Sequence, residues 1–222
     1  MSLSKLLPTA MIALVAVAAG PAFAMGERPS EAPSAAPAAS STGASSIAEM
    51  ESAAGHVLVL GPRLTFETAK GRFTVVTFPK EAPLAVSQLV ALAEGGFYDG
   101  VAFHRLVPNF VIQAGDPLTK TNPVTDPKVG KGGSGKTLPA EFQGQTVKHL
   151  VGTVGMARGR DANSADSQFY VTLAPTPHLD TNYTIWGQVI SGMDVVRTLE
   201  LGDKITKVTV SGKPAPAATP AP

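Results

Sequence analysis

Cysteine is absent from this chain of 222 residues. Without thiols the chain can form no disulfide, no thiolate metal site and no cysteine nucleophile. Acidic and basic residues nearly balance, and the formal net charge is +1. Electrostatics therefore give no case for binding nucleic acid or an acidic membrane surface. The lack of cysteine is compatible with an oxidising compartment but does not establish one.

Long apolar runs are also scarce. The run near the start of the chain, at residues 10–19, is short for a membrane span. Lys5 precedes it, and a small-x-small cleavage site ending at Ala24 follows it. This order predicts a secretory signal over residues 1–24, and thus an exported protein, periplasmic or secreted. The alternative is anchoring by an uncleaved N-terminal segment; after cleavage we expect no stable membrane insertion.

Composition divides the remainder into three parts. Residues 25–55 are rich in Ala, Pro and Ser and poor in large apolar side chains, so we expect a flexible leader there. Residues 212–222 have the same character and predict a disordered Pro/Ala tail. The folded domain is therefore expected over residues 56–211, which is long enough for one sizeable core.

Short strands dominate the predicted domain. Two β-rich runs around a Gly-containing link predict a hairpin over 63–68 and 73–78. The segment 81–94, with Pro83 in its first turn, predicts a helix, and a shorter helix is expected over 193–200. Further strands are expected at 101–103, 110–113, 151–156, 168–173, 183–189 and 205–210. Many short strands with two helices favour a mainly β fold, an antiparallel sheet closed into a barrel.

The segment 103–116 is the most informative part of the chain. Its alternating pattern places Arg105 and Gln113 on one parity among large apolar side chains, so a strand would send both to one face. Polar donors in an apolar floor are typical of a small binding cleft. The alternatives are a surface arginine held in an ion pair and a structural core amide.

The sequence gives little support for two other functions, nucleotide binding and hydrolysis. Residues 130–137 satisfy G-x-x-x-x-G-K-S/T, but the preceding strand and following helix of a phosphate-binding loop are not predicted, so we expect no nucleotide site. The four histidines lack metal-ligand spacing, and no G-x-S-x-G or H-E-x-x-H motif occurs. We therefore expect neither a metal nor another cofactor.

The segment 103–116 resembles the signature of the cyclophilins, F-H-R-x-(I/V)-x-x-F-x-x-Q-x-G-D. Three more segments resemble the same family in the same order: 82–100, 130–142 and 156–171. The resemblance implies a closed eight-stranded antiparallel β-barrel capped by two α-helices. It also implies peptidyl-prolyl cis/trans isomerase activity on proline-containing polypeptides. We expect a monomer; the rival interpretation is a non-catalytic proline-binding or chaperone module on the same fold.

The resemblance also implies roles for individual residues. Arg105 matches the catalytic arginine. Gln113, on the same parity, would orient Arg105 or the substrate carbonyl. His104 is expected to stabilise the strand rather than to act as a general base. The residues matching the proline pocket are Phe110, Val111, Tyr170, Leu179 and Tyr183, although aromatic residues in strands are often simply core. Ala157 and Gln168 match positions that contact residues before the proline. Arg158, also expected to bind substrate, stands where many members have Asn.

Three positions of the expected pocket depart from the best-known family pattern. Tyr170 replaces a frequent Phe, and its hydroxyl needs a partner if it is buried. His178 stands where Trp is common, and Tyr183 where His is common. Because the Trp position is important for cyclosporin binding, we expect weak inhibition by cyclosporin.

Overall fold

The computed structural model describes residues 41–212. The predicted signal over residues 1–24, the first part of the expected leader and residues 213–222 of the expected tail lie outside this range. Within it, no helix combines the length and the apolar character that a membrane span requires. The fold described below therefore concerns the predicted domain and the segment immediately before it.

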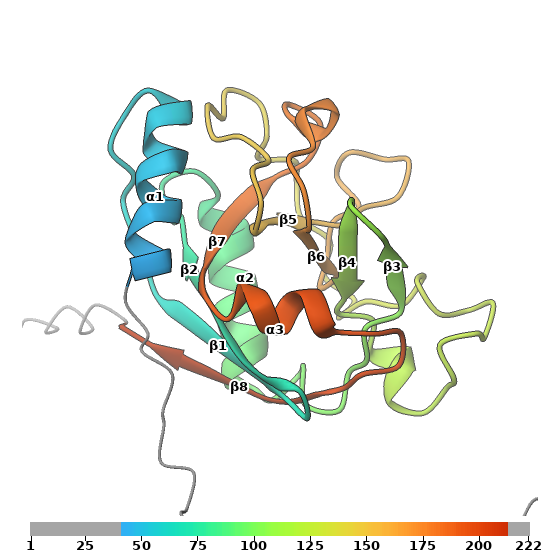
Figure 1. Cartoon of the computed structure of the whole chain (residues 1–222). Helices are drawn as coiled ribbons and strands as arrows, with labels where there is room; N and C mark the ends of the chain where they lie inside the picture. The colour runs from blue at the N-terminus through green and yellow to red at the C-terminus, as the bar shows by residue number, and fades with distance from the viewer. Residues whose placement is uncertain (1–40, 213–222) are drawn as a thin grey trace, which may run out of the picture. The chain divides into compact units, whose positions relative to one another are not determined.

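Eight strands form one antiparallel sheet in the order β3-β4-β6-β5-β7-β2-β1-β8 (Figure 1). The predicted hairpin is confirmed, and its strands place the large apolar side chains Phe66 and Phe73 opposite each other. The strands are β1 (Arg63–Thr68), β2 (Gly71–Thr77), β3 (Arg105–Val107), β4 (Val111–Ala114), β5 (Thr153–Met156), β6 (Phe169–Thr172), β7 (Ile185–Ser191) and β8 (Ile205–Ser211). The mainly β prediction is thus confirmed.

The predicted closure of the barrel is wrong. The sheet is an open, curled half-barrel whose end strands, β3 and β8, do not pair with each other. The predicted strand at 101–103 is reduced to one bridge between Ala102 and Lys204. Backbone hydrogen bonds join residues 100–103 to residues 202–205 around this bridge, but they end before β3 begins.

The two predicted helices are confirmed as α2 (Pro83–Glu94) and α3 (Met193–Thr198). A third helix, α1 (Ser41–Ala54), corrects the expectation of a flexible leader up to residue 55. Met50 on this helix is fully buried at 0 % exposure. It packs with Leu58 and Phe78 in a small apolar cluster, and α1 lies along β7 (Figure 1).

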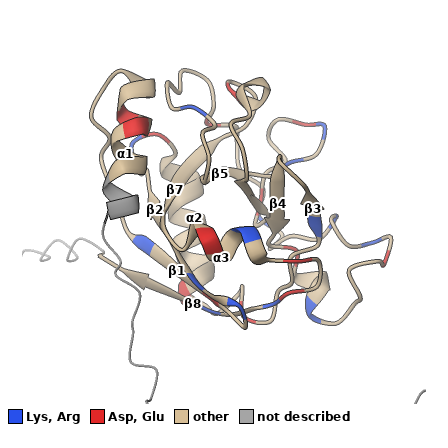
Figure 2. Cartoon of the chain, viewed as in Figure 1, with Lys and Arg blue, Asp and Glu red and all other residues tan. Residues whose placement is uncertain are grey.

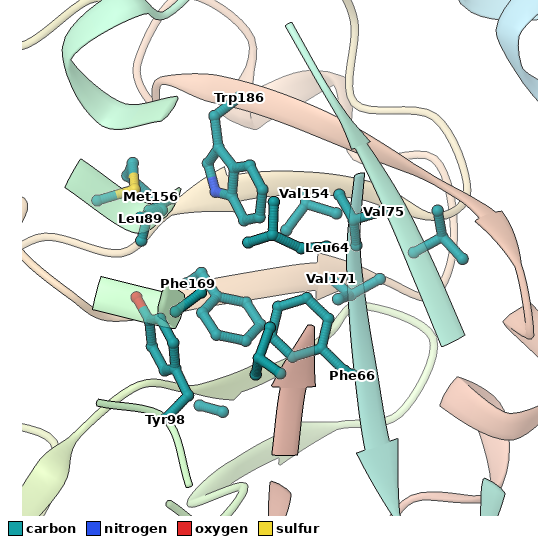
Figure 3. Packing of buried hydrophobic residues seen from close by; sticks show 14 of the residues in the cluster. Leu64, Phe66, Val75, Leu89, Tyr98, Val154, Met156, Phe169, Val171 and Trp186 are labelled. Atoms are coloured by element: carbon teal, nitrogen blue, oxygen red, sulfur yellow. The ribbon is translucent and has the colours of Figure 1, made fainter. Parts of the chain in front are cut away.

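The main core lies between the sheet and α2. Phe169 meets Trp186 edge-on with their ring centroids 6.1 Å apart (Figure 3). Phe66 stacks on Phe73 with 4.8 Å between the ring centroids. A separate apolar cluster, centred on Val111, Tyr170 and Leu179, does not belong to this core. The sheet thus contributes to three apolar clusters: the main core, the small cluster beneath α1, and this one, which is available for a binding site.

Candidate active site

The segment 103–116 folds as a hairpin rather than as one alternating strand. The chain reverses at 108–110, where Asn109 adopts a left-handed conformation with φ 56°. Arg105 and Gln113 are cross-strand partners, so they share a face because β3 pairs with β4. The predicted common face is correct, but the turn, and not the parity of a single strand, produces it.

Arg105 stands exposed on the end strand β3. Its Cζ atom lies 5.7 Å from the centroid of the Phe110 ring. No carboxylate among residues 41–212 forms an ion pair with it. The structure therefore does not support the alternative of a surface arginine held in an ion pair. The guanidinium retains its donors for another group.

Gln113 belongs to a chain of amides that leads away from Arg105. Its Nε2 donates to Oε1 of Gln168 at 2.9 Å, and Nε2 of Gln168 donates to the carbonyl of Gly132 at 2.8 Å. His104 lies beside this chain, with its Nε2 3.5 Å from Nε2 of Gln113. Burial lowers the pKa of His104, which favours the neutral ring near pH 7. The hairpin therefore presents one cation, Arg105, on this face.

The five residues of the predicted proline pocket come together with Ala157 in the separate apolar cluster. Tyr170 and Tyr183 meet edge-on at 6.0 Å between centroids and form a corner of it. The buried members are Val111, Tyr170 and Leu179, and the partly buried ones are Phe110, Ala157 and Tyr183. Phe110, which is partly buried, connects this cluster with Arg105.

The remaining predicted contacts border this cluster. His178 is exposed and stacks on Phe110 with 5.3 Å between centroids. Arg158 donates from Nε and Nη2 to the carbonyl of Asn182 at 3.1 and 2.9 Å. Its Cζ also lies 4.6 Å from the ring centroid of Tyr183. Arg158 therefore fixes the loop that carries Tyr183, and most of its donors are already engaged.

The glycine-rich loop at 130–135 forms one side of an adjoining cavity of about 380 Å³, which Gln113, Arg158 and Gln168 also line. The amides of the loop bind carboxylates of this same chain. Gly130 and Gly132 donate to Asp116, while Ser134 and Gly135 donate to Asp166. These carboxylates use the donors that a phosphate-binding loop would offer to a nucleotide.

Sequence reasoning missed two residues beneath the cluster. The hydroxyl oxygen of Tyr170 lies 2.8 Å from Nε2 of His149, and Nδ1 of His149 lies 2.8 Å from Oδ1 of Asp180. The requirement of a buried tyrosine hydroxyl for a partner was the available signal. Within residues 41–212, no group of three or more potential metal-ligand side chains is suitably placed for a metal ion.

This geometry can be compared with known proteins. The family profile described as cyclophilin type peptidyl-prolyl cis-trans isomerase/CLD matches residues 63–218. The chain belongs to this family. Its activity is therefore peptidyl-prolyl cis-trans isomerisation, and the resemblance noted in the sequence is confirmed. The family match begins after α1, which is an addition on the N-terminal side of the matched region.

Individual relatives agree with the family assignment. Peptidyl-prolyl cis-trans isomerase-like 1 of Emericella nidulans is 39% identical over 141 residues, covering 62% of this chain and 81% of that protein. Isomerase-like 2 of Gibberella zeae is 40% identical over 138 residues, which are 60% of this chain but only 22% of that longer protein. A cyclophilin type isomerase of Cryptosporidium parvum superposes with a TM-score of 0.60 at 26% identity, over 70% of this cyclophilin and 100% of that chain.

Proposed function

We propose that this cyclophilin binds the proline ring of its substrate in the cluster of Val111, Tyr170 and Leu179, while Arg105 stabilises the twisted amide. The observation that carries the proposal is the position of Arg105. Its guanidinium, which forms no ion pair with any described residue, stands beside an apolar cluster that is separate from the core. A structure of the Cryptosporidium parvum isomerase, 27% identical with a TM-score of 0.55, was obtained in the presence of the dipeptide Ala-Pro and supports a proline-containing ligand.

The chemistry requires no proton transfer and no covalent intermediate. Rotation about a peptide bond crosses a barrier of about 18–20 kcal/mol because the amide resonance is broken. In the twisted state the proline nitrogen regains its lone pair and becomes a better hydrogen-bond acceptor. A donor aimed at that nitrogen binds the transition state more strongly than the planar ground state, which lowers the barrier.

The required stabilisation is within reach of a few polar contacts. Uncatalysed isomerisation takes tens of seconds, so a millisecond reaction needs an acceleration of about 10⁴-fold, or about 5–6 kcal/mol. One preorganised donor contributes about 3–4 kcal/mol in other enzymes. Arg105 would supply that donor, and the amide chain of Gln113 and Gln168 would orient the peptide around the proline.

Removing the guanidinium tests this mechanism. We expect Arg105→Ala to lower kcat/KM on a Xaa-Pro peptide by about 10²–10³-fold, and Arg105→Lys to recover little because it lacks the planar fork. Arg63→Ala removes another exposed strand arginine and serves as the matched control, with unchanged kinetics. A normal rate in Arg105→Ala would assign the stabilisation to another group. No rate above background in the wild type would favour a holding module instead.

The compartment is a separate part of the proposal. The signal expected over residues 1–24 would send the protein to the periplasm or outside the cell, where it would accelerate the proline-limited folding of exported chains. The mass of the mature protein checks this expectation. A chain cleaved after Ala24 supports export, whereas a full-length chain in the membrane fraction supports anchoring.

A further inference from the structure

A hydrogen-bonded chain of three side chains, Asp180–His149–Tyr170, lies beneath the proposed proline pocket. His149 is 1 % exposed and Tyr170 is 4 % exposed, so the contacts between them are shielded from water. A carboxylate only accepts hydrogen bonds, so the proton on the ring must be at Nδ1, which donates to Asp180. Nε2 of His149 then accepts from the hydroxyl of Tyr170. Each member of the chain has one defined role.

The ring of Tyr170 has little freedom to lie elsewhere. Tyr170 on β6 is opposite Gly155 on β5, and a Cβ atom at Gly155 would lie 2.5 Å from Cζ of the tyrosine. The ring therefore occupies the space over a strand position that only glycine leaves empty. Its far end is held by His149. The glycine and the histidine together determine where the floor of the pocket lies.

His149 also holds the segment that forms a wall of the pocket. The carbonyl of His149 accepts from the amide of Thr176 at 2.9 Å, and its own amide donates to Oδ1 of Asp180 at 2.9 Å. Between these two attachments lies Leu179, a buried member of the pocket cluster. One residue thus connects the floor, through Tyr170, with the wall, through Leu179.

The charges around His149 favour its neutral form. Burial lowers the pKa of His149, against the opposing effect of Asp180, while His178 and Lys148 act in the same direction as burial. Nζ of Lys148 lies 3.8 Å from Oδ2 of Asp180 and shares that carboxylate. Burial also raises the pKa of Tyr170, so its hydroxyl keeps the hydrogen that it donates.

We propose that His149 and Asp180 are positioning residues that fix Tyr170 and Leu179 for binding of the substrate proline. The proposal rests on the placement of the proline in this cluster. Neither residue is assigned a chemical step, since rotation about the amide moves no proton. Their contribution is expected in binding, and Arg105 on β3 keeps its own contribution to the rate of the bound substrate.

Kinetics of four variants on a Xaa-Pro peptide test the proposal. We expect His149→Leu to raise KM about 10-fold with kcat within about twofold, because it leaves the Tyr170 hydroxyl and Asp180 without their partner. The double variant His149→Leu/Tyr170→Phe should have a lower KM than His149→Leu alone, because the unsatisfied hydroxyl is then absent. His149→Gln, which keeps one donor and one acceptor, should be intermediate. Lys207→Met removes an exposed cation on β8, outside this network, and is the control that should match the wild type.

Two results would overturn the proposal. One is an effect of His149→Leu confined to kcat; the other is strictly additive losses in the double variant. If His149→Leu does not fold, Tyr170→Phe alone still decides, because it keeps the ring and removes only the hydroxyl. It should raise KM about threefold if the hydrogen bond fixes the ring, and an unchanged KM would contradict the proposal.

A spectroscopic measurement separates this proposal from the proposed function. The ring ¹⁵N shifts of His149 should report a protonated Nδ1 and an accepting Nε2, and the Nε2 signal should move in Tyr170→Phe. A ring protonated at Nε2 in the wild type would refute the chain. Absence of isomerisation, in contrast, would refute the catalytic mechanism while leaving the tautomer as found.

Discussion

Asp116 offers the sharpest test of how the glycine-rich side of the site is held. Its side chain is fully buried at 0 % exposure, just after β4. Oδ1 accepts from the amide of Leu118 at 2.8 Å, while Oδ2 accepts from the amides of Gly130 and Gly132 at 2.5 and 3.1 Å. Three backbone donors from two segments therefore depend on one carboxylate.

The expected cost of removing the carboxylate follows from these contacts. A buried donor left without a partner costs about 1–3 kcal/mol, and hydrogen bonds to charged groups lie at the upper end. Allowing the loop to relax and admit water, we expect Asp116→Ala to lower the free energy of unfolding by about 3–5 kcal/mol. Asp116→Asn preserves the side-chain volume, but its amide NH₂ would replace one carboxylate oxygen. That NH₂ cannot accept from the amides of Gly130 and Gly132, so the cost should be similar.

Urea unfolding measures this effect directly. With a slope of about 1–3 kcal/mol per molar urea, a loss of 3 kcal/mol moves the midpoint by about 1 M or more. Asp194→Asn replaces an exposed carboxylate on α3 and should change stability by less than about 0.5 kcal/mol. A loss below about 1 kcal/mol in Asp116→Asn would show that the carboxylate is not what holds the loop. Activity should fall as well, because Gln168 donates to the carbonyl of Gly132 in this loop.

Three further predictions follow from other parts of the molecule. Met50→Ala should destabilise the protein by about 2–5 kcal/mol, which thermal unfolding measures. The kcat/KM of the folded fraction should be unchanged in a kinetic assay, because Met50 packs in a cluster separate from the site. Burial lowers the pKa of His104 and of His149 from 6.5, so at mildly acidic pH the unfolded chain binds protons that the folded chain does not. The free energy of unfolding should therefore fall as pH drops below about 6.5. Urea unfolding at pH 7.5 and 5 measures this fall, and equal stability at both pH values would contradict it. Cyclosporin should inhibit weakly because His178, stacked on Phe110, replaces the common Trp, and a nanomolar inhibition constant would refute this.

Local patterns predicted the elements whose stability is largely local. The hairpin of β1 and β2 and the helix α2 follow from alternation, a Gly-containing link and Pro83. α1 could not be predicted in this way. Its sequence offers few large apolar residues, and the helix depends on Met50 docking against Phe78, which comes later in the chain. The prediction of a closed barrel was wrong for a related reason: strand alternation does not indicate whether the two end strands of a sheet pair with each other.

The site was predictable to the extent that the family pattern reaches individual positions. The five predicted pocket residues lie in one cluster with Ala157, and Arg105 and Gln113 share one face of the hairpin. His149 and Asp180 were not predicted, because they are 31 positions apart and meet only in the folded chain. Tyr170 in place of the common Phe indicated that its hydroxyl needs a hydrogen-bond partner. A single sequence does not indicate which polar residue supplies that partner.

The polar side chains around the site fall into two groups, those that hold the protein together and one that is left for the substrate. Asp116 holds the glycine-rich loop, Arg158 holds the carbonyl of Asn182, and His149 holds Tyr170. Each of these polar groups is committed to the protein, whereas Arg105 forms no ion pair within the described chain. Electrostatic catalysis requires such an arrangement, because a donor that must first leave an internal partner loses part of its advantage. If Arg105 acts as proposed, weakening any one of the three attachments should impair substrate binding before it affects the rotation itself.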